Sequence, residues 1–156
     1  MESTTRTLAC RVLVVDDRRD VRHISQHFWR RRAKVVTAED GRFAIDVALA
    51  AHEAGQPFDL VVMYMQMPNL DGLQATAQLR SAGIQWPIIA LTADAMKGDR
   101  QRCLDGGCDD YLSKPIDHDK LVGMAARYTQ DITQQELQQQ RDERAVERQR
   151  RLGKTQ

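Results

Sequence analysis

Residues 58–72 of the chain read FDLVVMYMQMPNLDG, and this stretch decides the fold. It contains the longest unbroken apolar run in the sequence, the six residues from Leu60 to Met65. An apolar run that does not alternate with polar residues is typical of a strand buried on both faces, as in a parallel sheet. The run is far shorter than the roughly 20 residues that span a bilayer. After it, Asp71 is well placed to cap a helix that ends near Gly83.

The same pattern repeats on both sides of this stretch. Continuous apolar runs occupy residues 12–15 and 88–91, and shorter strand candidates lie at 34–37 and 110–112. Between them, apolar residues recur at the three- and four-residue spacing of a helix face. Five strands that alternate with five helices predict an α/β fold with a doubly wound, five-stranded parallel sheet. The five helices are marked by Val21, Ile24 and Phe28; by Ala44, Val47, Ala48 and Ala51 behind a capping Asp40; by Leu73, Thr76, Ala77 and Arg80; by the segment from about Asp94 to Leu104; and by Leu121, Met124, Ala125 and Tyr128, which start near Asp117.

The composition fits one domain with an appendage. The chain has 156 residues, 42% hydrophobic and 29% charged, and its net charge is +1. A net charge this close to zero excludes a domain that binds nucleic acid or anionic lipid through its overall charge. The first ten residues hold no apolar signal segment, and the three cysteines make no disulfide framework, so we expect a cytoplasmic chain with free thiols at Cys103 and Cys108. We divide it into an N-terminal extension (1–9), a folded domain (10–128) and a C-terminal tail (129–156).

The tail differs from the rest of the chain in composition. Residues 131–156 hold 11 charged residues and only four large apolar ones, and eight glutamines follow position 129. Glutamine, glutamate and arginine favour helix, but the apolar positions follow no heptad. We therefore expect a helical or disordered tail, and a solvated extension in preference to a helix that binds a partner.

Polar residues follow the predicted strands where a ligand site is expected. In a doubly wound sheet, ligands bind beyond the carboxyl ends of the strands. The first strand ends in Asp16-Asp17, the fourth in Thr92, and the fifth runs into Lys114. Two carboxylates can hold Mg²⁺, while a hydroxyl and an ammonium group can bind the oxygens of a transferred phosphoryl group. A site of this kind also needs a nucleophile, normally a carboxylate, at the end of the middle strand, where this chain has Tyr64.

These residues resemble the receiver domain of two-component response regulators over roughly residues 10–128. The resemblance implies the flavodoxin-like fold, in agreement with the strand and helix pattern. The motifs stand in the family's order, with 47, 28 and 22 residues separating Asp17, Tyr64, Thr92 and Lys114. They are Asp16-Asp17, the stretch 58–72, Leu91-Thr92-Ala93 and Ser113-Lys114-Pro115, and the segment Pro87 to Ala95 is similar to receivers attached to hybrid histidine kinases.

The resemblance also implies roles for individual residues. Asp17 would be the main carboxylate ligand of Mg²⁺, with Asp16 assisting and the backbone carbonyl of Gln66 as a further ligand. Thr92 and Tyr111 would form the pair of switch residues that report phosphorylation, and Lys114 would contact the phosphoryl group. The first helix would be where a histidine kinase or a histidine phosphotransfer protein docks. The resemblance also leaves a homodimer open, either through the fourth helix, fifth strand and fifth helix or through the tail, and the sequence does not decide the oligomeric state.

Tyr64 departs from the family, because it stands where a receiver carries its phosphate-accepting aspartate. Asp59 cannot replace that aspartate, since it begins the strand five residues upstream. A phenol with a pKa of about 10 is a poor acceptor of phosphoryl groups from histidine. Its ring also takes the place of an anionic metal ligand. We therefore expect no aspartyl-phosphate here, and Mg²⁺ binding that is weak or absent.

Two explanations of Tyr64 stay open, and they lead to different functions. Either the residue is natural and the chain is a pseudo-receiver, which catalyses no reaction and acts by binding a kinase, a phosphotransfer protein or a downstream target. Or it is an engineered block in an ordinary phosphoryl-accepting regulator, because Asp16, Asp17, Thr92 and Lys114 are all present. A flavin or nucleotide binder is disfavoured because the sequence has no glycine-rich phosphate loop. The chain length suggests a receiver without an output domain.

Overall fold

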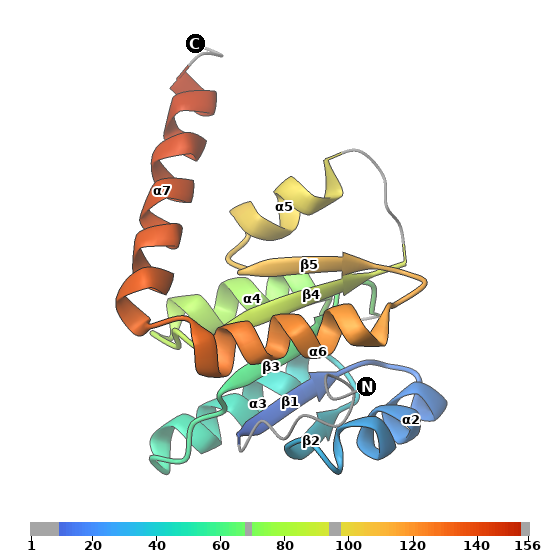
Figure 1. Ribbon diagram of the computed structural model, residues 1–156. Coiled ribbons are helices and arrows are strands. Elements are labelled where there is room, and N and C mark those ends of the chain that lie inside the picture. Colours follow the sequence, from blue (N-terminus) through green and yellow to red (C-terminus); the bar gives the residue numbers. More distant parts are fainter. Residues whose placement is uncertain (1–9, 68–69, 94–97, 154–156) are drawn as a thin grey trace.

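A five-stranded parallel sheet lies at the centre of the computed structural model, which describes residues 10–67, 70–93 and 98–153 (Figure 1). The strand order is β2-β1-β3-β4-β5, and every neighbouring pair is parallel. This confirms the doubly wound sheet that the sequence predicts. The strands are β1 (Arg11–Val15), β2 (Lys34–Ala38), β3 (Leu60–Tyr64), β4 (Ile88–Thr92) and β5 (Asp110–Ser113).

Helices cover both faces of the sheet. On one face, α3 (Gly41–Glu53), α4 (Gly72–Ser81) and α5 (Asp99–Asp105) pack against alternate residues of the strands. On the other face lie α2 (Arg19–Trp29) and α6 (His118–Ala126). Because both faces are covered, all five residues of β3 are buried, which is why its sequence is continuously apolar.

Aspartates and glycines bound the helices as the sequence predicts. The side chain of Asp40 accepts a hydrogen bond from the backbone of Phe43 at 2.8 Å, and Asp117 caps α6 in the same way. Asp71 forms a capping box with Gln74, in which each side chain bonds the other residue's backbone N–H. Gly83 follows α4 with a φ of 87°, a conformation that favours glycine. The predicted start of the fourth helix at Asp94 lies outside the described residues, and α5 begins at Asp99.

The tail is where the structure adds most to the prediction. A π-helical turn, η1 (Arg127–Asp131), continues α6, so the predicted domain boundary at residues 128 and 129 falls inside a helical turn. After Ile132 the chain turns into a second helix, α7 (Gln134–Gly153), which stands beside α5 in Figure 1. Thr133 and Glu136 cap its start by exchanging backbone-to-side-chain hydrogen bonds of 3.2 and 3.0 Å. The tail is therefore helical, but one face of it is docked on the domain.

The three cysteines are free and buried in the domain. Burial is the main cause that raises the pKa of the Cys10 thiol to about 11 and that of Cys108 to about 12. Burial raises the pKa of the Cys103 thiol as well. Thiols of this kind are protonated near neutral pH and react slowly, because the thiolate is the nucleophile.

We expect the free energy of unfolding to fall as the pH rises above about 9. In the unfolded chain, Cys10 and Cys108 ionise near their ordinary pKa of 9.0, whereas the folded chain keeps both neutral to about 11 and 12. The stability they contribute is complete below pH 9 and is lost as the pH rises toward the folded values. Denaturant unfolding near pH 8 and near pH 10 should differ by about 2 to 3 kcal/mol, and by less in Cys10→Ala. Equal free energies at the two pH values would contradict this expectation.

None of the helices in the described ranges is both long and apolar enough to cross a membrane.

Candidate functional site

Four strands bring the predicted site residues to one end of the sheet. Asp16 and Asp17 follow β1, and Tyr64, Thr92 and Lys114 stand at or just after the ends of the other three. The register aligns these ends, because Val15 pairs with Met63, Tyr64 with Leu91, and Thr92 with Ser113. β1 and β3 meet where the order of strands reverses, which is the usual place for a ligand in this fold. We call these five residues the Tyr64 pocket.

The ring of Tyr64 is buried and contacts two cations. Only 7% of the residue is exposed. The guanidinium carbon of Arg18 lies 4.5 Å from the ring centroid, and Nζ of Lys114 lies 4.6 Å from it. Both distances are within the range of a cation–π attraction, which strengthens when water is excluded. The aromatic ring therefore holds two positive charges in the pocket.

Arg18 also forms an ion pair with the carboxylate of Asp16. Its Nε donates to Oδ1 at 3.0 Å and its Nη2 donates to Oδ2 at 2.9 Å, so one planar fork engages both oxygens. Asp16 is 3% exposed, and Arg22 donates to its backbone carbonyl at 2.9 Å. The hydrogen bond to Asp16 is the main cause that raises the pKa of Arg18. An arginine thus takes the coordination positions that Asp16 would offer to a metal ion.

The side chain of Gln66 links the ends of two strands. Its Oε1 lies 3.3 Å from the Tyr64 hydroxyl and accepts a hydrogen bond from the backbone N–H of Ala93, also at 3.3 Å. That N–H stands at the end of β4, beside Thr92, where an oxygen anion would find a donor. Our sequence prediction gave a role only to the backbone carbonyl of Gln66. In the structure, the side chain of Gln66 instead accepts the hydrogen bond of the Ala93 backbone N–H, which is one of the donors of the pocket.

The remaining predicted residues are placed around this centre. Thr92 is buried at the end of β4, and the backbone N–H of Lys114 donates to its carbonyl at 2.8 Å. Burial, and then the nearby Arg18, lower the pKa of Lys114. Tyr111 lies in β5 opposite Ala90 and is half-buried. The pocket therefore assembles Asp16, Asp17, Tyr64, Thr92 and Lys114, with Tyr111 further back along β5.

When Arg18 is counted with the Tyr64 pocket, the formal charges cancel. Asp16 and Asp17 carry two negative charges, and Arg18 and Lys114 carry two positive ones. Within residues 10–67, 70–93 and 98–153, no three His, Cys, Asp or Glu side chains gather closely enough to hold a metal ion. Arg18 directly follows the two aspartates in the sequence, but our sequence prediction gave it no role in the site.

An apolar groove runs from the pocket along α2 and α6. It encloses about 230 Å³ and is lined at one end by Asp16, Arg18 and Lys114. Ile24 of α2 is the most exposed large apolar residue in the described part of the chain, at 59%. The apolar lining of the groove consists of Val14, Val15, Val21, Ile24, Phe28, Trp29, Val62, Leu91, Ile116 and Leu121.

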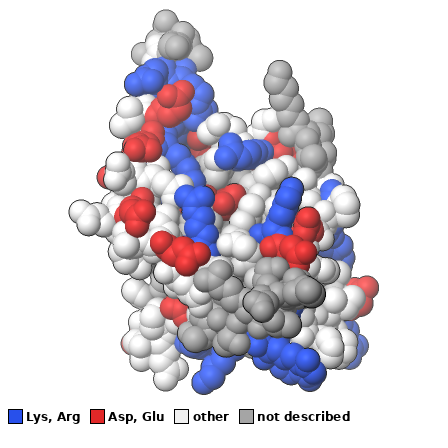
Figure 2. Space-filling model, viewed as in Figure 1, with Lys and Arg blue, Asp and Glu red and all other residues white. Residues whose placement is uncertain are grey.

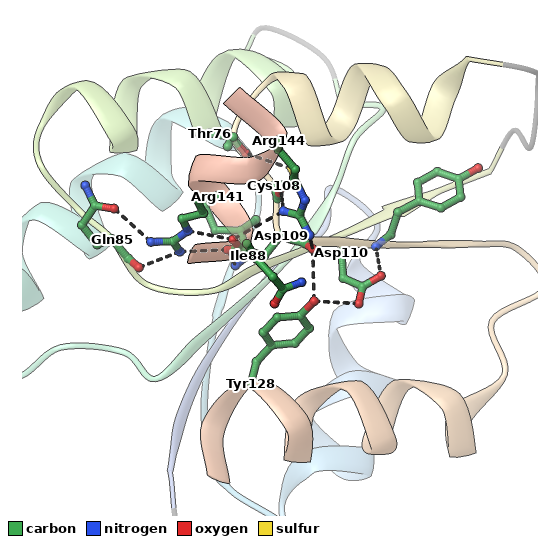
Figure 3. Close-up of polar contacts among 12 residues, drawn as sticks. Thr76, Gln85, Ile88, Cys108, Asp109, Asp110, Tyr128, Arg141 and Arg144 are labelled. Atoms are coloured by element: carbon green, nitrogen blue, oxygen red, sulfur yellow. Dashed lines mark hydrogen bonds and ion pairs between the residues drawn. The ribbon is translucent and has the colours of Figure 1, made fainter. Parts of the chain in front are cut away.

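A second polar centre, which the sequence prediction missed, lies at the opposite end of β5. The carboxylate of Asp109, 1% exposed, is bound by Arg80 of α4 and Arg141 of α7 at 2.9–3.0 Å. Figure 3 shows the contact with Arg141. The backbone N–H of Ile88 donates to the same carboxylate at 3.0 Å. No local sequence pattern predicts this centre, because the residues that bind Asp109 are 21 to 32 residues away from it in the sequence.

The chain matches the response regulator receiver domain family over residues 12–126. Among curated proteins, it is 37% identical over 153 residues to the sensor histidine kinase GacS of Pseudomonas protegens. That alignment covers 94% of this chain and 16% of GacS, so the chain spans a small part of that relative.

Two solved structures are similar in fold and sequence. One is the receiver domain of the sensor histidine kinase PA1611 of Pseudomonas aeruginosa, with a magnesium ion coordinated in its active site cleft (TM-score 0.67, 33% identity, 78% of this chain and 98% of that one). The other is the receiver domain of the response regulator Ssk1 of Saccharomyces cerevisiae, crystallised with the histidine phosphotransfer protein Ypd1 (TM-score 0.69, 26% identity, 78% and 89% covered).

Proposed function

We propose, since this chain belongs to the response regulator receiver domain family, that it is a pseudo-receiver of two-component signalling. It forms no aspartyl-phosphate at position 64, catalyses no reaction of its own, and acts in the cytoplasm by binding other proteins. The observation that carries this proposal is the position of Arg18, which binds both oxygens of Asp16 and stacks on Tyr64.

Mg²⁺ does not fit the pocket in this arrangement. The ion prefers near-octahedral oxygen ligands and is usually held by one or two carboxylates. Here the Asp16 carboxylate is shared with Arg18, and an aromatic ring stands in the place of a third oxygen ligand. A guanidinium and an ammonium group close to the site would also repel a divalent cation. We infer that Mg²⁺ binding is weak or absent, in contrast to the PA1611 receiver domain, whose structure holds the ion.

An Mg²⁺ titration followed by backbone amide shifts tests this inference. In the unmodified chain we expect no saturable shift at Asp17 or Gln66 up to millimolar Mg²⁺. The double variant Tyr64→Asp/Arg18→Ala should show saturable shifts, because it gains a carboxylate and frees Asp16. Saturable shifts in the unmodified chain, with a dissociation constant in the millimolar range or below, would contradict the inference that the pocket does not bind Mg²⁺.

The partner we propose is a histidine kinase or a histidine phosphotransfer protein, which docks on α2 along the apolar groove. Two observations support this surface: Ile24 is exposed on α2, and the similar Ssk1 receiver domain was crystallised with a phosphotransfer protein. A groove with an apolar floor and charged residues at one end has the composition of a protein-binding surface.

Replacing Ile24 by aspartate should weaken this association about tenfold or more, because it places a charge at the centre of an apolar contact. The matched control is Phe43→Asp, since Phe43 is also exposed, at 46%, but lies on α3 across the sheet. The binding partner is chosen first: it is the phosphotransfer domain from the same organism that has the highest affinity for the unmodified chain. Its affinity for each variant is then measured by titration calorimetry. Equal losses in the two variants, or none, would remove α2 as the docking surface.

A second candidate function is that of a phosphoryl-accepting regulator whose acceptor was replaced by Tyr64. The observation that favours it is that Asp16, Asp17, Thr92 and Lys114 are all present and converge at the strand ends. Self-association through α5, β5 and α6, or through α7, is compatible with either function.

A further inference from the structure

One face of α7 carries a stripe of arginines toward the domain. Leu137, Arg141, Arg144, Arg148 and Arg151 recur every three or four residues, so they lie on one side of the helix. Leu137 is 3% exposed, and Arg141 and Arg144 are also largely covered. The opposite side carries exposed residues such as Val146, at 58%. In Figure 2 the basic side chains can be followed along α7, at the upper left, down to the body.

Three arginines of this stripe, Arg141, Arg144 and Arg151, bind acceptors on the domain. Arg141 donates to both carboxylate oxygens of Asp109 and to the side chain and carbonyl of Gln85, each at 2.9–3.0 Å (Figure 3). Arg144 donates to the carbonyls of Cys108 and Asp109 at 3.3 and 2.7 Å. At the far end, Nη2 of Arg151 lies 2.9 Å from Asp105, and this contact is the main cause that lowers the pKa of Asp105. These contacts between α7 and the domain are polar.

The contacts of Arg144 continue into β5. The carbonyl of Asp109 that accepts from Arg144 also lies 3.1 Å from the hydroxyl of Tyr128. That hydroxyl is 2.9 Å from Oδ2 of Asp110, whose Oδ1 accepts a hydrogen bond from the backbone N–H of Tyr111 at 2.9 Å. Figure 3 shows the sequence of contacts from α7 through Tyr128 to the strand. The position of α7 is thereby linked to the strand that leads to Lys114.

We propose that α7 is a releasable strap, clamped to the domain by Arg141 and Arg144, and that its docking fixes the conformation of β5 around Tyr111. The strap gives the domain a regulatory contact 20 or more residues away from the Tyr64 pocket in sequence. The proposal does not depend on whether the pocket accepts a phosphoryl group.

Two features make α7 separable from the domain. First, Leu137 is the only apolar member of the stripe, and the contact of Arg151 with the partly exposed carboxylate of Asp105 is weak and screened by salt. Second, residue 132 has extended backbone angles between two helical segments, and Thr133 begins α7 with its own capping box. The helix can therefore leave the body as a unit, and a ligand that competes for the arginines would carry carboxylates.

The test is amide hydrogen exchange of the full chain, with two double variants of equal charge change. Arg141→Gln/Arg144→Gln removes the clamp, whereas Arg148→Gln/Arg150→Gln removes two charges of α7 that make no hydrogen bond to the domain in the described contacts. In the clamp variant we expect the amides of residues 138–152 to exchange about tenfold faster or more, and the backbone amide resonances of Asp110 and Tyr111 to shift. The control should match the unmodified chain in both respects.

Each of the following results would overturn the proposal. If α7 keeps its protection in the clamp variant, or the control loosens α7 equally, then Arg141 and Arg144 do not clamp the helix. If α7 loosens while the resonances of Asp110 and Tyr111 stay unchanged, then docking is not linked to β5. Thermal unfolding of both variants shows whether the domain itself remains folded, and a global loss of protection outside α7 would also count against a separable strap.

Discussion

Replacing Tyr64 by aspartate should give a chain that binds Mg²⁺ and takes up one phosphoryl group from a small-molecule donor. The substitution removes the ring that holds Arg18 and Lys114 and adds a third carboxylate beside Asp16 and Asp17. The new carboxylate oxygen can attack the phosphorus of the donor, whose leaving group departs with the bonding electron pair. Lys114 then faces a dianionic phosphoryl group instead of an aromatic ring. The dianion is the more favourable partner for an ammonium group.

Intact mass after incubation with acetyl phosphate and Mg²⁺ measures this gain. The matched control is Tyr64→Asn, which has nearly the shape of the aspartate but no nucleophilic oxygen anion, and we expect it to stay unmodified. Adding Arg18→Ala to Tyr64→Asp should raise the rate further, because both oxygens of Asp16 become available to the metal ion. If folded Tyr64→Asp binds Mg²⁺ but stays unmodified with every donor, then position 64 is not the acceptor position.

The largest loss of stability should come from Asp109→Asn. The carboxylate of Asp109 is 1% exposed and lies 2.9–3.0 Å from donors of Arg80 and Arg141. Without it, two largely buried guanidinium groups would have no carboxylate partner, and breaking a buried pair from one side costs about 3–5 kcal/mol. The expected result is a decrease of that size in the free energy of unfolding in denaturant.

Asp105→Asn is the matched control for this prediction. Asp105 pairs with Arg151 at the partly exposed end of α7, so the same substitution there should cost less than about 1 kcal/mol. A loss at Asp109 no larger than the loss at Asp105 would show that the buried cluster does not stabilise the fold.

Local patterns predicted the fold because each strand and helix is specified by nearby residues. The buried run from Leu60 to Met65 forms the central strand, and Asp40, Asp71 and Asp117 cap the helices assigned to them. These signals depend only on the spacing of apolar residues along the chain and on capping hydrogen bonds between residues about three positions apart. A single sequence is therefore enough to show them.

The sequence predicted which residues form the candidate site, but it did not predict how their side chains contact one another. Strand ends placed Asp16, Tyr64, Thr92 and Lys114 together, because parallel strands finish at the same edge. The contacts of Arg18 depend on its rotamer, since a long side chain beside a carboxylate can point to solvent or into the pocket. Sequence spacing does not determine that choice.

The tail was the part that sequence patterns described least well. We looked for an apolar heptad and found none, but the face that docks carries arginines at the same spacing. Their acceptors, Gln85, Cys108 and Asp109, are 32 to 56 residues away and include backbone carbonyls, which no side-chain pattern reveals. Polar docking of this kind requires the tertiary structure.

The most direct test of the central claim is the intact mass of the unmodified chain after incubation with acetyl phosphate and with a phosphorylated histidine phosphotransfer domain, both with Mg²⁺. Folded Tyr64→Asp run in parallel shows that the donors are active. We predict that the unmodified chain keeps its original mass under both conditions while Tyr64→Asp gains one phosphoryl group. A phosphorylated aspartate in the unmodified chain, located by peptide mapping, would contradict the claim that this domain signals without receiving a phosphate.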